Sequence, residues 1–225
     1  MKIKFGAIVT DGRGKLGGHV LAKNRSGNYM RTKVTPVNPQ TTFQQEQRSA
    51  LGTLSSGWSG LTDAQRAAWD GAVLSFQKTD IFGDLRSPTG KNLYTGLNRN
   101  LLNAGQSIIS VPPSPETIPS ITIASAGGGV AADTFTIVTT GDSTGAFVQS
   151  WASPTLSNGT TFVKNRIRFV QSDAGASPLT ADLKVAYQAR FGIPAAGDNI
   201  YVAVRVINAG GEAGVIQTFK ATIVA

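Results

Sequence analysis

Four of the ten prolines fall in the short segment from Val111 to Pro119. Proline lacks a backbone N–H and has a fixed φ, so neither a helix interior nor a central strand tolerates such a segment. The composition predicts a stiff, extended linker instead. We therefore divide the chain at 111–119 into a first part, residues 1–110, and a second part, residues 120–225.

The net charge changes at the same boundary. Residues 1–110 hold 14 Lys and Arg against 6 Asp and Glu, whereas residues 111–225 hold 7 of each. Most of the excess lies in Met1–Val34, where eight basic residues accompany a single acid, Asp11. This concentration favours an anionic partner, either an acidic protein surface or nucleic acid. The candidate docking residues are the basic side chains of this segment: Lys2, Lys4, Arg13, Lys15, Lys23, Arg25, Arg31 and Lys33.

Residues 1–40 are predicted to form a basic β-ribbon that serves as a docking arm. Apolar and polar or basic side chains alternate in Lys2–Val9 and again in Met30–Val34, which is the period of a half-buried strand. His19–Lys23 fits a short strand between them, followed by a turn at Arg25–Asn28. We expect one apolar and one cationic face. Because such a ribbon is marginally stable alone, its apolar face is expected to pack on neighbouring helices.

Residues 41–110 are predicted to form three short helices. Thr42–Gln45 and Thr62–Gln65 have the spacing of a capping box, Ser87–Pro88 is typical of a third helix start, and Gly105 is expected to end that helix. Apolar side chains at helical spacing supply a small core. They are Phe43, Ala50, Leu51, Leu54, Trp58, Trp69, Ala72, Val73, Phe76, Leu93, Leu97 and Leu101.

Residues 120–225 carry the patterns of short antiparallel strands. The clearest are Thr134–Thr140, Ala146–Ala152, Phe162–Val170, Asn199–Asn208 and Val215–Val224. Thr180–Phe191 fits a short helix better, with Gly192 as its end. We count six strands and expect a β-sandwich of the immunoglobulin or fibronectin-III type. The predicted fold class is α+β: a basic ribbon with short helices, followed by an immunoglobulin-like sandwich.

Motifs for catalysis or cofactor binding are weak. Gly12–Gly17 has the G-x-G-x-x-G spacing, but a dinucleotide site needs an acid about 20 residues on, and none occurs between Asp11 and Glu46. With one histidine and no cysteine, no serine triad or zinc site is readable. Asp80 and Asp84 are interpreted as solvated loop acids, with weak cation binding as the alternative. We expect no enzyme activity, cofactor or metal.

Two blocks within Gly17–Trp69 resemble structural proteins of tailed bacteriophages. They are Pro36-Val37-Asn38-Pro39-Gln40-Thr41 and Leu61-Thr62-Asp63-Ala64-Gln65-Arg66-Ala67-Ala68-Trp69. The resemblance covers under a third of the chain and brings no catalytic residues. It implies a virion component, an auxiliary (decoration) capsid protein such as a crAss-like phage would carry. The implied partner is the major capsid protein or another virion protein, and the implied location is the virion, after synthesis in the host cytoplasm.

Three functions stay open at this point. The first is a non-enzymatic capsid protein that the ribbon anchors to the shell, with the sandwich facing outward. The second is a nucleic-acid-binding virion protein. The third is a glycan-binding capsid appendage, for which Trp151, Tyr187 and Tyr201 are candidate contacts, with a place in the core as the equal alternative for each. A membrane partner is not expected, since no apolar run approaches the roughly 18 residues that a membrane helix needs. Many copies per particle are expected, while the oligomeric state is not readable.

Overall fold

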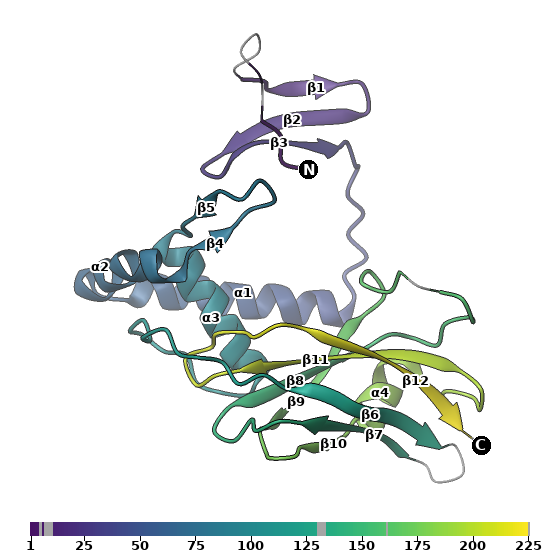
Figure 1. The fold of residues 1–225 in the computed structure, drawn as a ribbon. Helices are drawn as coiled ribbons and strands as arrows, with labels where there is room; N and C mark the ends of the chain where they lie inside the picture. The colour runs from purple at the N-terminus through teal and green to yellow at the C-terminus, as the bar shows by residue number, and fades with distance from the viewer. Residues whose placement is uncertain (5, 7–10, 130–133, 161, 225) are drawn as a thin grey trace.

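A computed structural model describes residues 1–4, 6, 11–129, 134–160 and 162–224. It shows a mixed α+β protein in which a small N-terminal sheet, a group of helices and a large sheet follow one another along the chain (Figure 1). The three helices within residues 42–103 lie between the two sheets, and a short hairpin lies between these helices and the small sheet. Among the described helices, none has the length and apolar character needed to cross a membrane.

Strands β1 (Gly14–Leu16), β2 (His19–Asn24) and β3 (Gly27–Thr32) form an antiparallel sheet. We call this sheet the ribbon, and we include residues 1–4 and Lys33, which hydrogen-bond to its strands and turn. The predicted strand at 19–23 is confirmed, and β3 begins three residues before the predicted 30–34. Of the predicted strand at 2–9, Lys2 forms an isolated bridge with Tyr29. Residues 5 and 7–9 of that prediction lie outside the described residues.

The first two helices begin at threonine caps. Helix α1 (Thr42–Gly60) is capped by Thr41, whose hydroxyl accepts from the Gln44 N–H at 3.4 Å, one residue earlier than predicted. Two adjacent threonines each precede a glutamine by three residues, so the spacing alone does not choose between them. Helix α2 (Asp63–Ala72) has the predicted capping box at Thr62 and continues into the 3₁₀ turn η1 (Val73–Phe76).

Helix α3 (Gly90–Asn103) starts two residues later than the predicted Ser87–Pro88, because the Thr89 hydroxyl caps it by accepting from the Asn92 N–H at 3.2 Å. It ends just before Gly105, as predicted. The predicted leucine face at 93, 97 and 101 is buried.

The three helices enclose a small core around Trp69. Its indole is fully buried and meets the Tyr94 ring edge-on, with the ring centroids 5.4 Å apart. Leu54 and Leu93 complete the same cluster. The predicted core face of α1 is wrong at its first turns, because Phe43 and Leu51 are exposed.

A hairpin that the sequence analysis did not predict projects from the helices toward the ribbon (Figure 1). It consists of β4 (Lys78–Thr79) and β5 (Leu85–Arg86), paired antiparallel. We call residues 78–86 the acidic hairpin, because its turn carries Asp80 and Asp84.

The second half of the chain forms a seven-stranded sheet in the order β10-β7-β6-β12-β11-β8-β9. The strands are β6 (Thr122–Gly129), β7 (Thr134–Thr140), β8 (Phe147–Ala152), β9 (Arg168–Ala174), β10 (Thr180–Asp182), β11 (Asn199–Ile207) and β12 (Gln217–Val224). All neighbours are antiparallel except β6 and β12, which pair in parallel. Phe135 and Ala181 from one half of the sheet share a core with Val148 and Val202 from the other half. The sheet therefore folds over on itself.

The sequence patterns located β7, β8, β11 and β12 to within two residues. The predicted strand at Phe162–Val170 is wrong over its first six residues: Phe162 is exposed, residues 164–166 form a turn, and β9 begins only at Arg168. Helix α4 (Lys184–Phe191) ends at Gly192 as predicted, but the first residues of the predicted helix pair with β7 as β10.

Helix α3 joins the helices to the large sheet. The Asn100 side-chain amide donates to the Gly211 carbonyl at 2.8 Å, and the buried Gln149 donates to the Asn100 carbonyl at 3.0 Å. The 111–119 segment runs beside the sheet, where the Glu116 N–H donates to the Glu212 carboxylate at 3.0 Å. The two halves of the chain are therefore in direct contact.

Candidate docking surface

The strand register of the ribbon places basic side chains on one face. Lys15 and Arg31 both lie opposite Val20, one from each side, so all three share a face. Leu21 and Met30 pair on the other face. The register thus agrees with the predicted faces for Lys15 and Arg31. Val20 interrupts the cationic face, and Lys23, two residues after Leu21, lies on the apolar one.

Two of the eight candidate residues bind the acidic hairpin. The Lys2 ammonium lies 3.5 Å from an Asp80 oxygen, and the Lys4 ammonium lies 2.9 Å from an Asp84 oxygen. Lys4 also lies 5.3 Å from the centre of the Phe82 ring. The expectation that Lys2 and Lys4 face an outside partner is therefore corrected: they attach the ribbon to the acidic hairpin.

Asp80 organises this attachment, which corrects its interpretation as a solvated loop acid. Its side chain is only 2% exposed. One oxygen accepts from the backbone N–H of Phe82 at 2.8 Å and of Asp84 at 3.2 Å, and the other accepts from Arg86 at 3.2 Å. The carboxylate thus shapes the hairpin turn and also binds Lys2 of the ribbon.

The pKa of Asp80 gives a pH test of this attachment. Burial raises the pKa, but the hydrogen bonds from Phe82, Arg86 and Asp84 and the charge of Lys2 outweigh it and lower the pKa from 3.8 to about 2. Because the pKa is lower in the folded state, Asp80 stabilises the fold fully above about pH 4. We expect this contribution to be lost as the pH falls through about 2. The loss would be seen as lower protection factors for the β3 amides, that is, as faster exchange relative to the intrinsic rate at each pH. The Asp80→Asn variant should lose this pH dependence, and an unchanged profile would contradict the role assigned to Asp80.

The remaining basic residues divide into two groups. Arg13 and Lys23 share Asp11, at 3.9 and 3.3 Å. The others are exposed and form no ion pair within the described residues; they are Lys15, Arg25, Arg31 and Lys33. We call these four the free cations.

The free cations lie at different places on the ribbon. Lys15 and Arg31 are side by side, and the chain at Lys33 continues the pairing, since its N–H donates to the Gly18 carbonyl at 2.8 Å. Arg25 lies in the turn between β2 and β3. Tyr29, on the same face as Arg31, pairs with Lys2, so the hairpin is attached near one end of this face. Lys15 and Arg31 lie further along this face, away from the Tyr29–Lys2 pair.

The described apolar side chains of the ribbon do not join the helical core, which corrects that expectation for them. The described strands of the ribbon make their contacts with one another and with the acidic hairpin, and Leu16 is 64% exposed. The ion pairs at Asp80 and Asp84 turn the ribbon so that Lys2 faces the hairpin. Exposed apolar side chains also lie on the hairpin, at Ile81 and Leu85.

The blocks that carry the phage resemblance have clear roles in folding. Residues 36–41 lie in the exposed connection before α1, where Asn38 accepts from Arg48 at 2.6 Å and Thr41 caps the helix. The second block is the start of α2, with its capping box at Thr62 and the buried Trp69. Both blocks therefore position helix starts.

The aromatic residues proposed for glycan binding do not form an exposed cluster. Tyr187 is 1% exposed, which corrects its interpretation as a contact residue. The Trp151 ring lies under the Arg205 guanidinium, with 4.9 Å between the ring centre and the guanidinium carbon. The Tyr201 hydroxyl donates to the Thr160 carbonyl at 2.8 Å. Each of the three therefore has a role within the fold.

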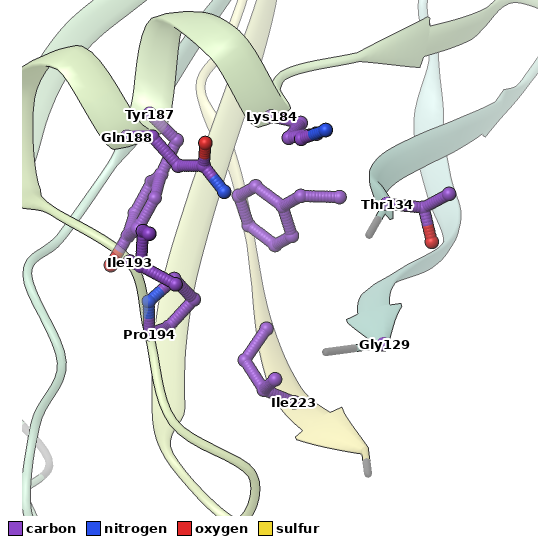
Figure 2. A pocket seen from close by; sticks show the side chains of 9 residues that line it. Gly129, Thr134, Lys184, Tyr187, Gln188, Ile193, Pro194 and Ile223 are labelled. Atoms are coloured by element: carbon purple, nitrogen blue, oxygen red, sulfur yellow. The ribbon is translucent and has the colours of Figure 1, made fainter. Parts of the chain in front are cut away.

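A small cavity beside α4 shows no features of a ligand site (Figure 2). It lies between Tyr187, Ile193 and Ile223 and measures about 40 Å³. Ligand pockets usually measure roughly 300 Å³ or more, so this space suits only a few water molecules. Burial, together with the charge of Asp198, raises the pKa of Tyr187 to about 12, which keeps its hydroxyl neutral.

The G-x-G-x-x-G motif and the lone histidine have structural positions. The glycines at 14 and 17 begin and follow strand β1, and the next element is strand β2 rather than the helix that a dinucleotide site needs. His19 is exposed and pairs with Thr32. Among the described residues, no group of three His, Asp or Glu side chains is placed to hold a metal ion.

Comparisons with known proteins add little to this geometry. No protein-family model and no curated protein matches the sequence. The periplasmic chaperone SfaE is similar over 47% of this chain, with 14% identity and a TM-score of 0.29, and this chain spans 56% of its length.

Two further solved structures are similar to part of the chain. A fibronectin-III-like protein from Clostridium thermocellum matches over 48% of this chain and 93% of its own, with 12% identity and a TM-score of 0.27. The sensor domain of an anti-sigma factor from Pseudobacteroides cellulosolvens matches over 49% of this chain and 100% of its own, with 13% identity and a TM-score of 0.26. These scores are too low to carry a fold or a function to this chain.

Proposed function

We propose that this chain is a non-enzymatic virion protein that docks on a phage capsid through its basic ribbon and decorates or stabilises the shell. The observation that supports this most is the set of free cations, Lys15, Arg25, Arg31 and Lys33, which are exposed on a small folded sheet. The phage-like blocks supply the class of partner: the major capsid protein or another virion protein. In this proposal the chain is made in the host cytoplasm and located in the virion.

We also propose that the large sheet is an immunoglobulin- or fibronectin-III-like sandwich. Its seven strands, its mainly antiparallel order and its folding over a shared core support this. The parallel pairing of β6 with β12 joins the two layers in this interpretation. The sandwich would then be the part displayed outward, because its net charge is close to zero and it lies across the helices from the ribbon (Figure 1).

Many copies would make weak contacts sufficient. An exposed ion pair contributes only about 0–1 kcal/mol. Four such pairs, each near 0.7 kcal/mol, sum to about 3 kcal/mol, or roughly 100-fold in affinity. Copies that are held on one lattice also raise the effective concentration of their neighbours. The proposed docking therefore depends on the four free cations acting together.

Neutralising the free cations should weaken docking about 100-fold. The test variant changes Lys15, Arg25, Arg31 and Lys33 to Gln, and cosedimentation with purified capsid shells measures binding. The matched control removes the same charge from other exposed sites, with Lys91, Lys164, Arg166 and Lys220 changed to Gln. Equal losses in both variants would show a net-charge effect only and would contradict a shaped docking face, as would unchanged binding of the test variant.

Salt dependence separates capsid docking from nucleic-acid binding. If about six basic residues met phosphates, affinity for DNA would fall roughly 10³-fold between 50 and 200 mM salt. Docking that also buries the exposed Ile81 and Leu85 of the acidic hairpin should persist at 200 mM, because apolar burial is not screened. Tight retention of DNA by the purified protein at 200 mM salt, with no binding to shells, would favour the nucleic-acid function instead.

A further inference from the structure

Arg205 is a cation without an acidic partner at the junction between α3 and the large sheet. Its guanidinium donates to Gln149 from Nε at 3.2 Å and from Nη2 at 3.0 Å, and to Asn100 from Nη2 at 2.8 Å. It also lies over the Trp151 ring. All of these partners are neutral, and no described carboxylate lies within ion-pair distance.

Arg205 is half-buried. Charges that are largely removed from water in proteins are generally paired, so a half-buried guanidinium with only neutral partners is unusual. Burial lowers the pKa of Arg205, which reflects the cost of removing the charge from water. The neutral hydrogen bonds fix the plane of the guanidinium, while Nη1 takes part in none of the hydrogen bonds described for Arg205. An oriented cation with a donor to spare is suited to receive an anion.

Arg205 lines a groove of about 450 Å³, which is within the usual range for a ligand site. Lys78 and Arg86 add two further cations to the lining, of which Arg86 is paired with Asp80 and Asp84. Leu93, Leu97 and Ile118 add apolar surface. The acid in the lining, Glu212, already accepts from Asn208 at 2.7 Å and from the Glu116 N–H at 3.0 Å. The groove therefore combines free positive charge with aliphatic walls.

We propose that this groove binds an acidic segment of a partner protein, with a carboxylate on Arg205 and an apolar side chain against Leu93 and Leu97. The aliphatic walls favour a peptide over a nucleic acid backbone, which offers phosphates but no aliphatic side chains. None of the four free cations lines the groove, although Ser26, the neighbour of Arg25 in the ribbon turn, does. The inference rests on Arg205 and therefore does not depend on the proposed function.

The test uses the full-length protein and two peptides, one of alternating leucine and glutamate and one with glutamine in place of glutamate. Binding is followed by the NMR signal of the Arg205 Nε–H and by calorimetry. We expect the glutamate peptide to shift the Arg205 signal and to bind about ten-fold or more tightly than the glutamine peptide, since a hydrogen bond to a charged group contributes that much. Equal affinities for the two peptides would overturn the proposal without requiring any variant.

Variants then localise the site. Arg205→Gln should lose about ten-fold or more in affinity for the glutamate peptide. The matched control is Arg190→Gln, because Arg190 also lies over an aromatic ring, Phe43 at 4.0 Å, but outside the groove. Circular dichroism verifies that both variants fold. Undiminished binding by Arg205→Gln would overturn the proposal, and so would equal losses in both variants. It would also be overturned if a single-stranded oligonucleotide displaced labelled peptide at a lower concentration than unlabelled peptide does.

Discussion

Replacing Trp69 with alanine is expected to lower the free energy of unfolding by about 3–5 kcal/mol, the usual cost of emptying a buried tryptophan site. The indole is fully buried, packs edge-on against Tyr94 and donates from Nε1 to the Ser110 carbonyl at 2.9 Å. The variant therefore loses the centre of the helical core and also the hydrogen bond that fixes the chain just before the proline-rich segment. Urea denaturation followed by circular dichroism measures the change.

The conservative variant Trp69→Phe separates these two contributions. It keeps most of the ring packing but loses the hydrogen bond to Ser110, so a smaller loss of about 1–2 kcal/mol is expected. If alanine cost no more than phenylalanine, the packing of Trp69 against Tyr94 would not be the main source of stability in this core.

The second large effect is expected at Gly211, where the sheet meets α3. Its φ of +84° is a conformation that other residues adopt only with strain, and a Cβ atom there would lie 2.5 Å from the Leu97 carbonyl oxygen. The strain and the displacement of α3 together should cost about 2–5 kcal/mol in Gly211→Ala. Thermal unfolding and amide exchange at α3 would measure the effect.

Gly197→Ala is a matched control for this prediction. Its φ of +88° is nearly the same, but nothing lies within 4 Å of the position that its Cβ would take. It should therefore show the backbone strain alone, about 1–2 kcal/mol. Equal effects at both glycines would mean that α3 is not held closely against the sheet.

Local patterns predicted those elements whose stability is local. The capping box at Thr62 and the leucine face of α3 follow from spacing along one helix, and the alternation in 200–206 marks a buried strand face. Strand β6 was missed because its end, residues 127–129, is three glycines with no side chains to show a period. The short strands β4 and β5 give no periodic signal either.

The candidate site was predictable in charge but not in arrangement. The excess of basic residues was visible, yet Lys2 meets Asp80 across 78 positions, which no local pattern reveals. The turn chemistry of Asp80 and Gly83 offered one clue, since an aspartate before a glycine often orders a tight loop. For Arg205, the clue was a charged residue within an otherwise apolar strand. Its neutral partners come from distant parts of the chain and are seen only in the structure.

The exposed connection from residue 33 to residue 41 limits how far the ribbon can move from the start of α1. Nine extended residues span about 30 Å, and two prolines keep them from collapsing. If the Lys2 and Lys4 contacts open, the ribbon stays within that radius of Thr42 while both ends of the connection keep their folds. On a curved shell, where equivalent sites differ in spacing and tilt from one facet to the next, such a radius would let a single chain accommodate the mismatch by swinging its ribbon.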